Sequence, residues 1–133
     1  MSGCNSQPEL AKVTGSVLVD GQPLDQVKVS FVPDVGKGTE GYSSSAYTDE
    51  TGAFELSYGR LADRPGAVVG WHRVAVQDVK SENFRGEGSP PAIRVPSNIR
   101  KSGSTPIRLE IVAGEQTVDI DLADYGVKLP RKR

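Results

Sequence analysis

Apolar and polar residues alternate with a period of two in seven short stretches of the chain. They cover residues 12–19, 25–33, 42–48, 53–58, 71–77, 106–112 and 117–122. This alternation is typical of strands that bury one face and expose the other, and no stretch shows the 3.6-residue period of an amphipathic helix. The pattern therefore predicts an all-β protein.

Turn residues separate these stretches. Asp20-Gly21 stands between the first two, and Asp-Gly between alternating runs predicts a hairpin. Residues 49–52 supply another turn, in which Gly52 is free to take a positive φ. Residues 113–116 predict a further hairpin between the last two strands. Seven strands with one apolar face each favour an antiparallel β-sandwich of about 100 residues.

The apolar faces of the seven strands define the expected core. Its members are Val13, Val17, Val19, Val27, Val29, Phe31, Phe54, Leu56, Val74, Val76, Leu109, Ile111, Val118, Ile120 and Leu122. Full burial of each such side chain contributes roughly 1.5–3 kcal/mol before conformational entropy is subtracted. A core of this size holds a small domain together without a disulfide or a metal ion.

Three parts of the chain lack the strand pattern. Residues 1–12 are expected to form a flexible leader before a sandwich that spans 13–125, and residues 126–133 a basic tail. Within the sandwich, residues 78–105 show no period and are long for a loop in a compact domain, which predicts a mobile, irregular loop. The apolar residues expected to pin parts of this loop to the sandwich are Phe84, Ile93 and Ile99.

Charge and composition exclude several classes of function. The chain has 16 basic and 17 acidic residues, whereas a nucleic-acid binder needs surplus Lys and Arg to neutralise phosphates. Its single cysteine cannot form an internal disulfide, and its single histidine leaves too few ligands or bases for most metal sites and catalytic triads. No apolar run is long enough to span a bilayer. We therefore expect no metal, no cofactor and no nucleic-acid partner.

Three segments follow a recognisable order. They are "VTGSVLVDGQPLDQVKVSFVP" at 13–33, "YTDETGAFEL" at 47–56 and "GWHRVAV" at 70–76. In sequence they resemble the patterns V-x-G-x-V-x-x-D-G-x-P-L with V-x-V-x-F-x-P, T-D-x-x-G-x-F-x-L and G-x-H/Y-x-V-x-V of bacterial carboxypeptidase regulatory-like domains. The segment "VDIDL" at 118–122 is similar to the closing strand of that family.

This resemblance implies a transthyretin-like (prealbumin-like) fold, a seven-stranded antiparallel Greek-key β-sandwich. It also implies a short secreted lipoprotein, because many bacterial members look like envelope proteins with an anchor cysteine just before the first strand. The chain departs from the family after Asp78. Members often carry a Pro-x-Lys-Tyr segment there, whereas "RVPSNIRKSGST" has Pro96 and no tyrosine.

Cys4 fits the expected anchor. Met1-Ser2-Gly3-Cys4 occupies the places of a lipoprotein box, whose order is apolar, small, small, cysteine. The sulfur of such a cysteine takes a diacylglycerol and its amine can take a third chain, and a multi-chain anchor holds stably. No apolar signal segment precedes the box, so we expect the precursor to be longer than this chain. The sequence predicts lipidation at Cys4 and a place on a membrane of the bacterial cell envelope, on its periplasmic or surface side. The alternative is a stray exposed cysteine in the leader.

Trp71 and Arg73 are the candidate binding residues. In the strand 71–77 they alternate with His72, Val74 and Val76, so the two sets lie on opposite faces. An exposed Trp beside Arg can form a stacking platform for a sugar or a peptide, although packing under a loop explains it as well. His72 is expected to be half-buried and hydrogen-bonded to a neighbouring turn.

Two functions remain open. The first is a non-enzymatic envelope lipoprotein with a structural, adhesive or ligand-binding role, whose partners are other envelope proteins or a polysaccharide. The second is an enzyme, such as a hydrolase, on a transthyretin-like scaffold. Hydroxyisourate hydrolases use several histidines and a C-terminal Tyr-Arg-Gly-Ser, and intradiol dioxygenases bind iron through two Tyr and two His. The single histidine favours the first function.

Overall fold

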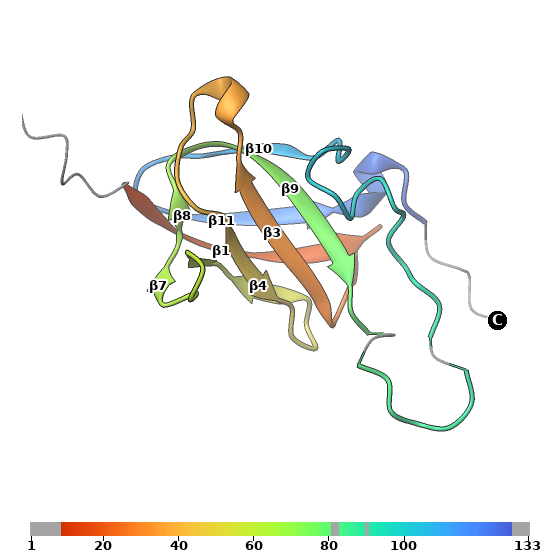
Figure 1. The fold of residues 1–133 in the computed structure, drawn as a ribbon. Coiled ribbons are helices and arrows are strands. Elements are labelled where there is room, and N and C mark those ends of the chain that lie inside the picture. The colour runs from red at the N-terminus through yellow and green to blue at the C-terminus, as the bar shows by residue number, and fades with distance from the viewer. Residues whose placement is uncertain (1–8, 81–82, 90, 129–133) are drawn as a thin grey trace, which may run out of the picture.

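The computed structural model describes residues 9–80, 83–89 and 91–128. Its strands form two sheets that pack face to face (Figure 1). Within the described residues, two short 3₁₀ helices accompany them, η2 (Val35–Lys37) and η3 (Leu122–Tyr125). In the described part of the chain, no helix combines the length and the apolar character needed to cross a membrane.

The first sheet is built around β1 (Leu10–Val19). One edge of β1 pairs in parallel with β11 (Glu115–Asp121), from Lys12 opposite Glu115 to Leu18 opposite Asp121. Three short antiparallel strands share its other edge, namely β8 (Ala67–Val68), β5 (Ala53–Glu55) and β2 (Gln22–Pro23). Gly15 allows the close pairing, because a Cβ there would lie 1.8 Å from the carbonyl oxygen of Val118.

The second sheet has six strands. In spatial order they are β10 (Arg108–Ile111), β9 (Gly70–Asp78), β3 (Val27–Pro33), β4 (Ser44–Tyr47), β6 (Ser57–Tyr58) and β7 (Arg64–Pro65). All neighbouring pairs in this sheet are antiparallel. One face covers the core, and the other face of β9, β3 and β4 points away from the first sheet.

The all-β sandwich predicted from the alternation is confirmed, but the division into strands differs. The described residues form eleven strands rather than seven. The predicted strand 53–58 is split at Leu56, where the chain leaves the first sheet for the second and the Leu56 amide donates to the carbonyl of Val13. The parallel β1–β11 pair is the exception among the antiparallel neighbours.

The hairpin predicted at Asp20-Gly21 forms in a short version, whereas the one predicted at 113–116 does not form. The Asp20-Gly21 turn returns the chain to β1 only for Gln22 and Pro23, and β3 then pairs in the other sheet. The second turn joins β10 to β11, which also belong to different sheets. A side chain closes this turn, because Gln116 accepts from the Val112 amide and donates to its carbonyl at 3.0 and 2.8 Å. Tight turns therefore link the two layers here as well as neighbouring strands.

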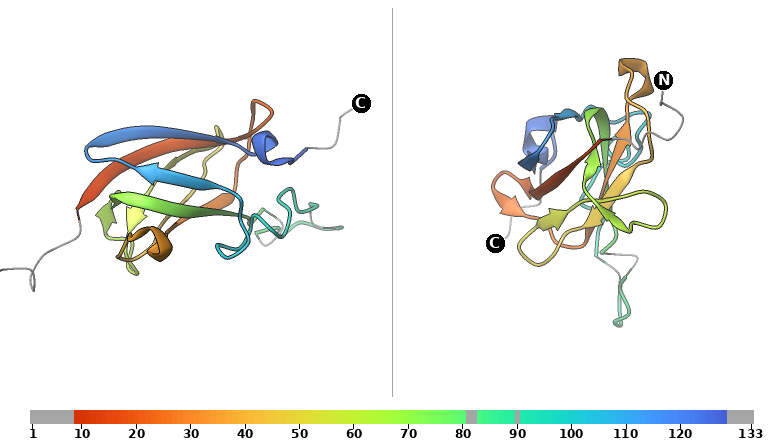
Figure 2. Two further views of the ribbon diagram at one scale, coloured as in Figure 1. Left: turned by 90° about the horizontal axis from the view of Figure 1, so that it is seen from above. Right: turned by 90° about the vertical axis from the view of Figure 1, so that its left-hand side faces the viewer.

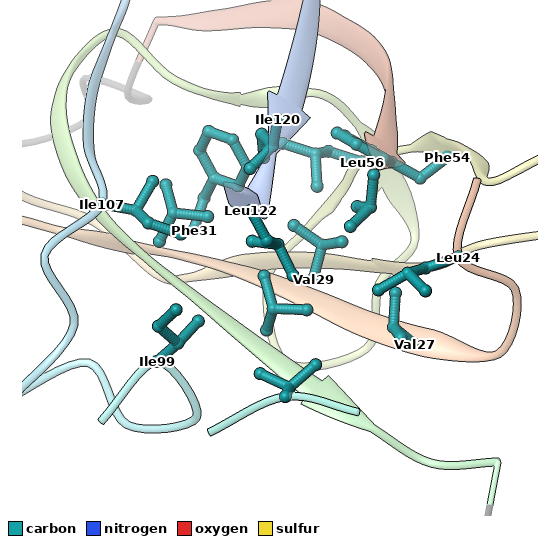
Figure 3. Close-up of a cluster of buried hydrophobic side chains, with 14 of the residues drawn as sticks. Leu24, Val27, Val29, Phe31, Phe54, Leu56, Ile99, Ile107, Ile120 and Leu122 are labelled. Carbon is teal, nitrogen blue, oxygen red and sulfur yellow. The ribbon is translucent and has the colours of Figure 1, made fainter. Parts of the chain in front are cut away.

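The core lies between the two sheets (Figure 3). Thirteen of the fifteen residues predicted for it are buried, whereas Leu109 and Val118 are partly buried and pack against it. These two lie on β10 and β11, the terminal strands of the two sheets, where fewer neighbours cover a side chain. The alternation therefore predicted the core well, and the two residues that are less buried than predicted lie on the terminal strands of the sheets.

The predicted ends of the domain shift slightly. β1 begins at Leu10, within the expected leader, because Ala11 is buried and pairs with Ala67 of β8. Val127, in the expected tail, is buried as well. Residues 1–8, which include Cys4, and residues 129–133 lie outside the described part of the chain.

The segment between β9 and β10 is partly attached to the sandwich. Ile99 is fully buried, as expected, and its carbonyl accepts from the Val76 amide at 3.0 Å. Val95 is also buried, whereas Phe84 is only partly covered and Ile93 is 53% exposed, so the expectation that Ile93 pins the loop is wrong. Ile93 lies next to Arg94, and that charged side chain makes the attachment instead.

Arg94 joins this segment to two other parts of the fold. Its Nε and Nη2 each donate to the carboxylate of Asp78 at 2.8 Å, and its Nη2 also donates to the carbonyl of Asp25 at 2.7 Å. Burial would raise the pKa of Asp78, but the hydrogen bonds from Arg94 and from the Lys80 amide outweigh it and lower that pKa. The irregular segment is thus tied to the end of β9 and to the turn before β3.

Candidate binding surface

Trp71 and Arg73 lie together on the outer face of the six-stranded sheet, as the sequence predicted. Both come from β9, and His72 between them points into the core and is fully buried. Trp71 is 37% exposed, so one part of its ring is covered and another part faces solvent. The burial pattern of β9 alternates at this point because one face meets the first sheet and the other does not.

The turn after β3 covers one side of Trp71. The Asp34 amide donates to the carbonyl of Trp71 at 2.9 Å, and the Asp34 carboxylate caps η2 by accepting from the Gly36 amide at 3.1 Å. Lys37, in the last turn of η2, places its Nζ 5.7 Å from the centroid of the Trp71 ring. An ammonium group at that distance is attracted to the π face of an indole.

Two arginines approach the same carboxylate. Asp34 is 4% exposed, and its oxygens lie 3.8 Å from Arg73 Nε and 4.0 Å from Arg108 Nη1. Arg108 stands opposite Arg73 in the β10–β9 pair. Both distances are longer than a hydrogen bond, so the carboxylate balances the charge while the guanidinium N–H groups keep their capacity to bind a ligand.

We name the group of Trp71, Lys37, Arg73 and Arg108 the Trp71 surface. It presents one aromatic ring with a lysine beside it, and two arginines beside the buried carboxylate of Asp34. Glu110 stands opposite Trp71 in β10 and adds one exposed acid at the border. Such a group can stack a sugar ring on the indole and hold a carboxylate or phosphate with the guanidinium groups.

Sequence reasoning missed three residues of this arrangement. Arg108 joins it through strand pairing across a gap of 35 positions, which alternation alone cannot reveal (108 − 73). Lys37 and Asp34 lie in a glycine-rich segment, where the Asp-x-Gly pattern of a capped turn was the available signal. The sequence located the aromatic ring, and the fold supplies most of the charge.

His72 is more deeply buried than expected. Its side chain is inaccessible to solvent and meets Phe31 edge to face, with ring centroids 5.7 Å apart. Its Nδ1 lies 3.0 Å from the carbonyl of Gly70, which belongs to the same strand β9 and not to a neighbouring turn as expected, while Nε2 is buried without a hydrogen-bond partner. Burial lowers the pKa of His72, although the Gly70 carbonyl and Asp34 act in the opposite direction. The imidazole is therefore neutral and serves the core.

The described residues contain no group of three or more His, Cys, Asp or Glu side chains arranged to hold a metal ion. The predicted lipidation residue, Cys4, lies outside the described residues. Comparisons with protein-family models, with curated proteins and with solved structures gave no match to this chain. The geometry of the Trp71 surface and the sequence motifs remain the basis for a functional proposal.

Proposed function

We propose that this chain is a non-enzymatic cell-envelope lipoprotein, held to a membrane through Cys4, and that its Trp71 surface binds an acidic polysaccharide. We further propose that its sandwich has the Greek-key topology of the transthyretin-like carboxypeptidase regulatory-like domains. The observation that carries the binding proposal is one lysine beside the partly exposed indole and, on the same pair of strands, two arginines beside a buried carboxylate.

The motif residues support the family proposal because they occupy positions with specific backbone demands. Gly15 permits the close approach of Val118, and Gly21 and Gly52 have φ of 81° and 78°, which favour glycine. Asp49, from the second motif, accepts from the amides of Thr51 and Ala53 at 2.9 and 3.0 Å and so fixes the turn before β5. These roles give a physical reason why the motif residues of this chain have the same spacing as those of the family.

A sugar acid suits the Trp71 surface better than a neutral sugar. The indole offers an apolar plane on which the C–H face of a sugar ring can stack. The guanidinium groups of Arg73 and Arg108 offer paired N–H donors of the kind that match carboxylates. The deep burial and neutrality of the only histidine in the chain support a binding role rather than a catalytic one.

The binding proposal is tested with polymers of different charge. We expect the full chain to bind polygalacturonate or alginate and to show at least about tenfold weaker binding to dextran, a loss of about 1.4 kcal/mol. Trp71→Ala and Arg73→Ala should each reduce binding to the acidic polymers by a similar factor. Tyr47→Ala is the matched control, because Tyr47 also lies under a lysine on this sheet, with Lys28 Nζ 5.9 Å from its centroid.

The results separate the proposal from simple charge attraction. Equal binding to polyglutamate and to polygalacturonate, or equal losses in Trp71→Ala and Tyr47→Ala, would contradict a glycan site at Trp71.

The anchor is tested separately by expressing the gene with its native upstream region and comparing membrane partition of the wild type with Cys4→Ser. Retention of both proteins in the membrane fraction would refute lipidation at Cys4.

A further inference from the structure

Large apolar side chains are exposed mainly at one end of the sandwich. Among the described residues, those exposed are Val35, Tyr42, Tyr47, Leu61, Trp71, Ile93 and Val112. Five of these seven lie at one end of the sandwich, where β1, β9 and β11 begin and β3, β6 and β10 end. These five are Val35, Tyr42, Leu61, Trp71 and Val112. Tyr47 ends β4, which runs away from this end, and Ile93 lies in the long segment beyond the far end of β9.

Hydrogen bonds fix the loops at this end. The Asp34 amide binds the carbonyl of Trp71, which places η2 beside the start of β9. The Gly59 amide binds the carbonyl of Ser43, which places the β6–β7 turn beside the segment before β4. The Lys12 amide binds the carbonyl of Gly114, which places the β10–β11 turn beside the start of β1. Figure 2 views this end directly in its right-hand panel.

Four of the five side chains project from these loops, and we name Val35, Tyr42, Leu61 and Val112 the loop-tip surface. Leu61 is 83% exposed in the β6–β7 turn, and Val35 is 77% exposed at the start of η2. A soluble surface rarely places its most exposed aliphatic residues together at loop tips unless another apolar phase or partner receives them. Trp71 lies at the border and belongs to the Trp71 surface.

A shallow cleft of about 560 Å³ opens between two of these residues. It is lined by Tyr42, Tyr58, Gly59, Arg60, Leu61, Asp63 and Arg64. The Tyr58 ring forms one wall, where its hydroxyl accepts from the Tyr42 amide at 2.9 Å and the Arg64 guanidinium lies 5.3 Å from its centroid. Aromatic rings beside arginines are suited to the boundary between acyl chains and polar headgroups.

The charges around the loop-tip surface balance. The exposed or partly exposed ionic residues in these loops and at the first positions of β7 and β11 are Lys37, Glu40, Arg60, Asp63, Arg64 and Glu115, three of each sign. A balanced surface fits zwitterionic phospholipid headgroups, which carry both signs, and gains little from an anionic lipid. Contact with a bilayer at this end would therefore depend on apolar insertion.

The chain enters the domain at this same end. The Glu9 carbonyl accepts from the Val69 amide at 2.9 Å, next to the pairing of Leu10 with Val68. Cys4 precedes Glu9 by five residues, which span at most about 18 Å even when fully extended. A lipid on Cys4 thus keeps this end, and not the opposite one, within reach of the headgroups.

From these observations we infer that the loop-tip surface rests on a zwitterionic phospholipid bilayer, with Leu61, Val35 and Val112 inserted into its interface. This inference rests on the proposed lipidation of Cys4. The domain then stands with β1 pointing away from the membrane and with the Trp71 surface facing sideways, close to the headgroups and open to a polymer in the envelope. The opposite end, with Tyr47 and Ile93, faces away from the membrane.

A tethered protein tests the orientation. The Cys4 thiol, the only one in the chain, is coupled to a maleimide lipid in phosphatidylethanolamine–phosphatidylcholine vesicles that contain brominated acyl chains. In a Trp71→Phe background, single tryptophans are introduced as Leu61→Trp or Val112→Trp, and as Tyr47→Trp or Ile93→Trp for comparison. Ile93 and Val112 form a matched pair, because they are 53% and 52% exposed in the native chain. Circular dichroism confirms that each variant folds.

The two ends should respond differently. We expect bromine quenching of at least about twofold at positions 61 and 112 and less than about 10% at positions 47 and 93, with little change between low and high salt. Equal quenching at all four positions would show a tumbling domain and overturn the inference. A blue shift at 61 and 112 without quenching would indicate contact with a second protein copy and would overturn it too. Because the tether is chemical, the outcome is independent of whether cells acylate Cys4.

Discussion

The guanidinium of Arg94 closes on both oxygens of Asp78, with Nε and Nη2 each 2.8 Å from the carboxylate. The two residues are 16 positions apart and belong to a stretch of sequence with no periodic signal. The pair is two-pronged, the Asp78 side chain is fully buried, and Asp25 accepts from the same guanidinium at 3.1 Å. A buried carboxylate held in this way depends strongly on its partner.

Removal of Arg94 should therefore destabilise the domain. Arg94→Ala leaves the carboxylate of Asp78 buried without its main donor, and we expect a loss of about 3 kcal/mol in the free energy of unfolding. Urea denaturation at neutral pH measures it. Arg100→Ala is the control, because Arg100 is exposed in the same segment and should change stability by less than about 0.5 kcal/mol. Similar midpoints for both variants would contradict the role assigned to Arg94.

Acid should weaken the domain through His72 before it affects the aspartates. The folded-state pKa of His72 lies below its ordinary value of 6.5, so the unfolded chain binds the proton more readily. Stability is then complete above about pH 6.5 and falls as the pH drops toward the folded-state pKa. We expect His72→Gln to remove this slope between pH 7 and 5, as measured by urea midpoints. Parallel pH dependence in both proteins would refute it, since the chain has no other histidine.

The pKa of Asp78 predicts a second, more acidic window. It is lowered in the folded state from an ordinary value of 3.8, so its contribution is present above about pH 4 and is lost as the pH falls further. Asp78→Asn should flatten the loss of stability below pH 4 while lowering stability at pH 7. Asp63→Asn, at an exposed turn, serves as the control for removal of one carboxylate and should change stability at pH 7 by less than about 0.5 kcal/mol. An unaltered acid limb in Asp78→Asn would contradict this assignment.

Gly15 should tolerate no side chain. A Cβ at this position meets the Val118 carbonyl oxygen at 1.8 Å and the Phe54 ring at 2.9 Å, so Gly15→Ala must separate β1 from β11. We expect a loss of at least about 3 kcal/mol or failure to fold, as for other clashes in a packed interior. Gly103→Ala has nothing within 4 Å of its added Cβ and is the matched control. Thermal melting of both variants decides the matter.

Limited proteolysis should reveal where the segment 78–105 is attached. Arg85 is exposed, whereas Arg94 is held by Asp78 and Asp25, so trypsin should cut after Arg85 first and leave the sandwich intact. Mass spectrometry of the early fragments identifies the position. Equal cleavage rates after Arg85 and Arg94 would contradict the attachment of the segment through Arg94. A first cut after Lys37, in the segment before β4, would contradict the expected order of cleavage.

The alternation along the chain predicted the positions of the principal strands because each has one face against the core. Val27, Val29 and Phe31 are examples, and all three are fully buried. The sequence pattern did not predict as well which strands pair with each other. Nothing in the residues 117–122 distinguishes a hairpin with β10 from the parallel pairing with β1, which depends on the approach of Val118 to Gly15. Side-chain periodicity reports which face is covered and not which strand lies alongside.

The candidate surface was predictable to a similar extent. Alternation within 71–77 placed Trp71 and Arg73 on the outer face, where the structure has them. Arg108 and Asp34 join them through strand register and a turn, which are long-range properties of the fold. The attachment by Arg94 was missed for the same reason, since a single arginine in an aperiodic segment gives no indication of the carboxylate it will meet.

The parallel pairing of β1 with β11 sets an order of events for the folding of the chain. Thr14 and Thr117 stand opposite each other, with their hydroxyl oxygens 3.3 Å apart, although 103 positions separate them. The longest strand of the first sheet therefore cannot pair with β11 until the residues of β11 have been synthesised. Contacts this distant in sequence close slowly, which gives a chaperone time to act on β1 before the sheet is complete.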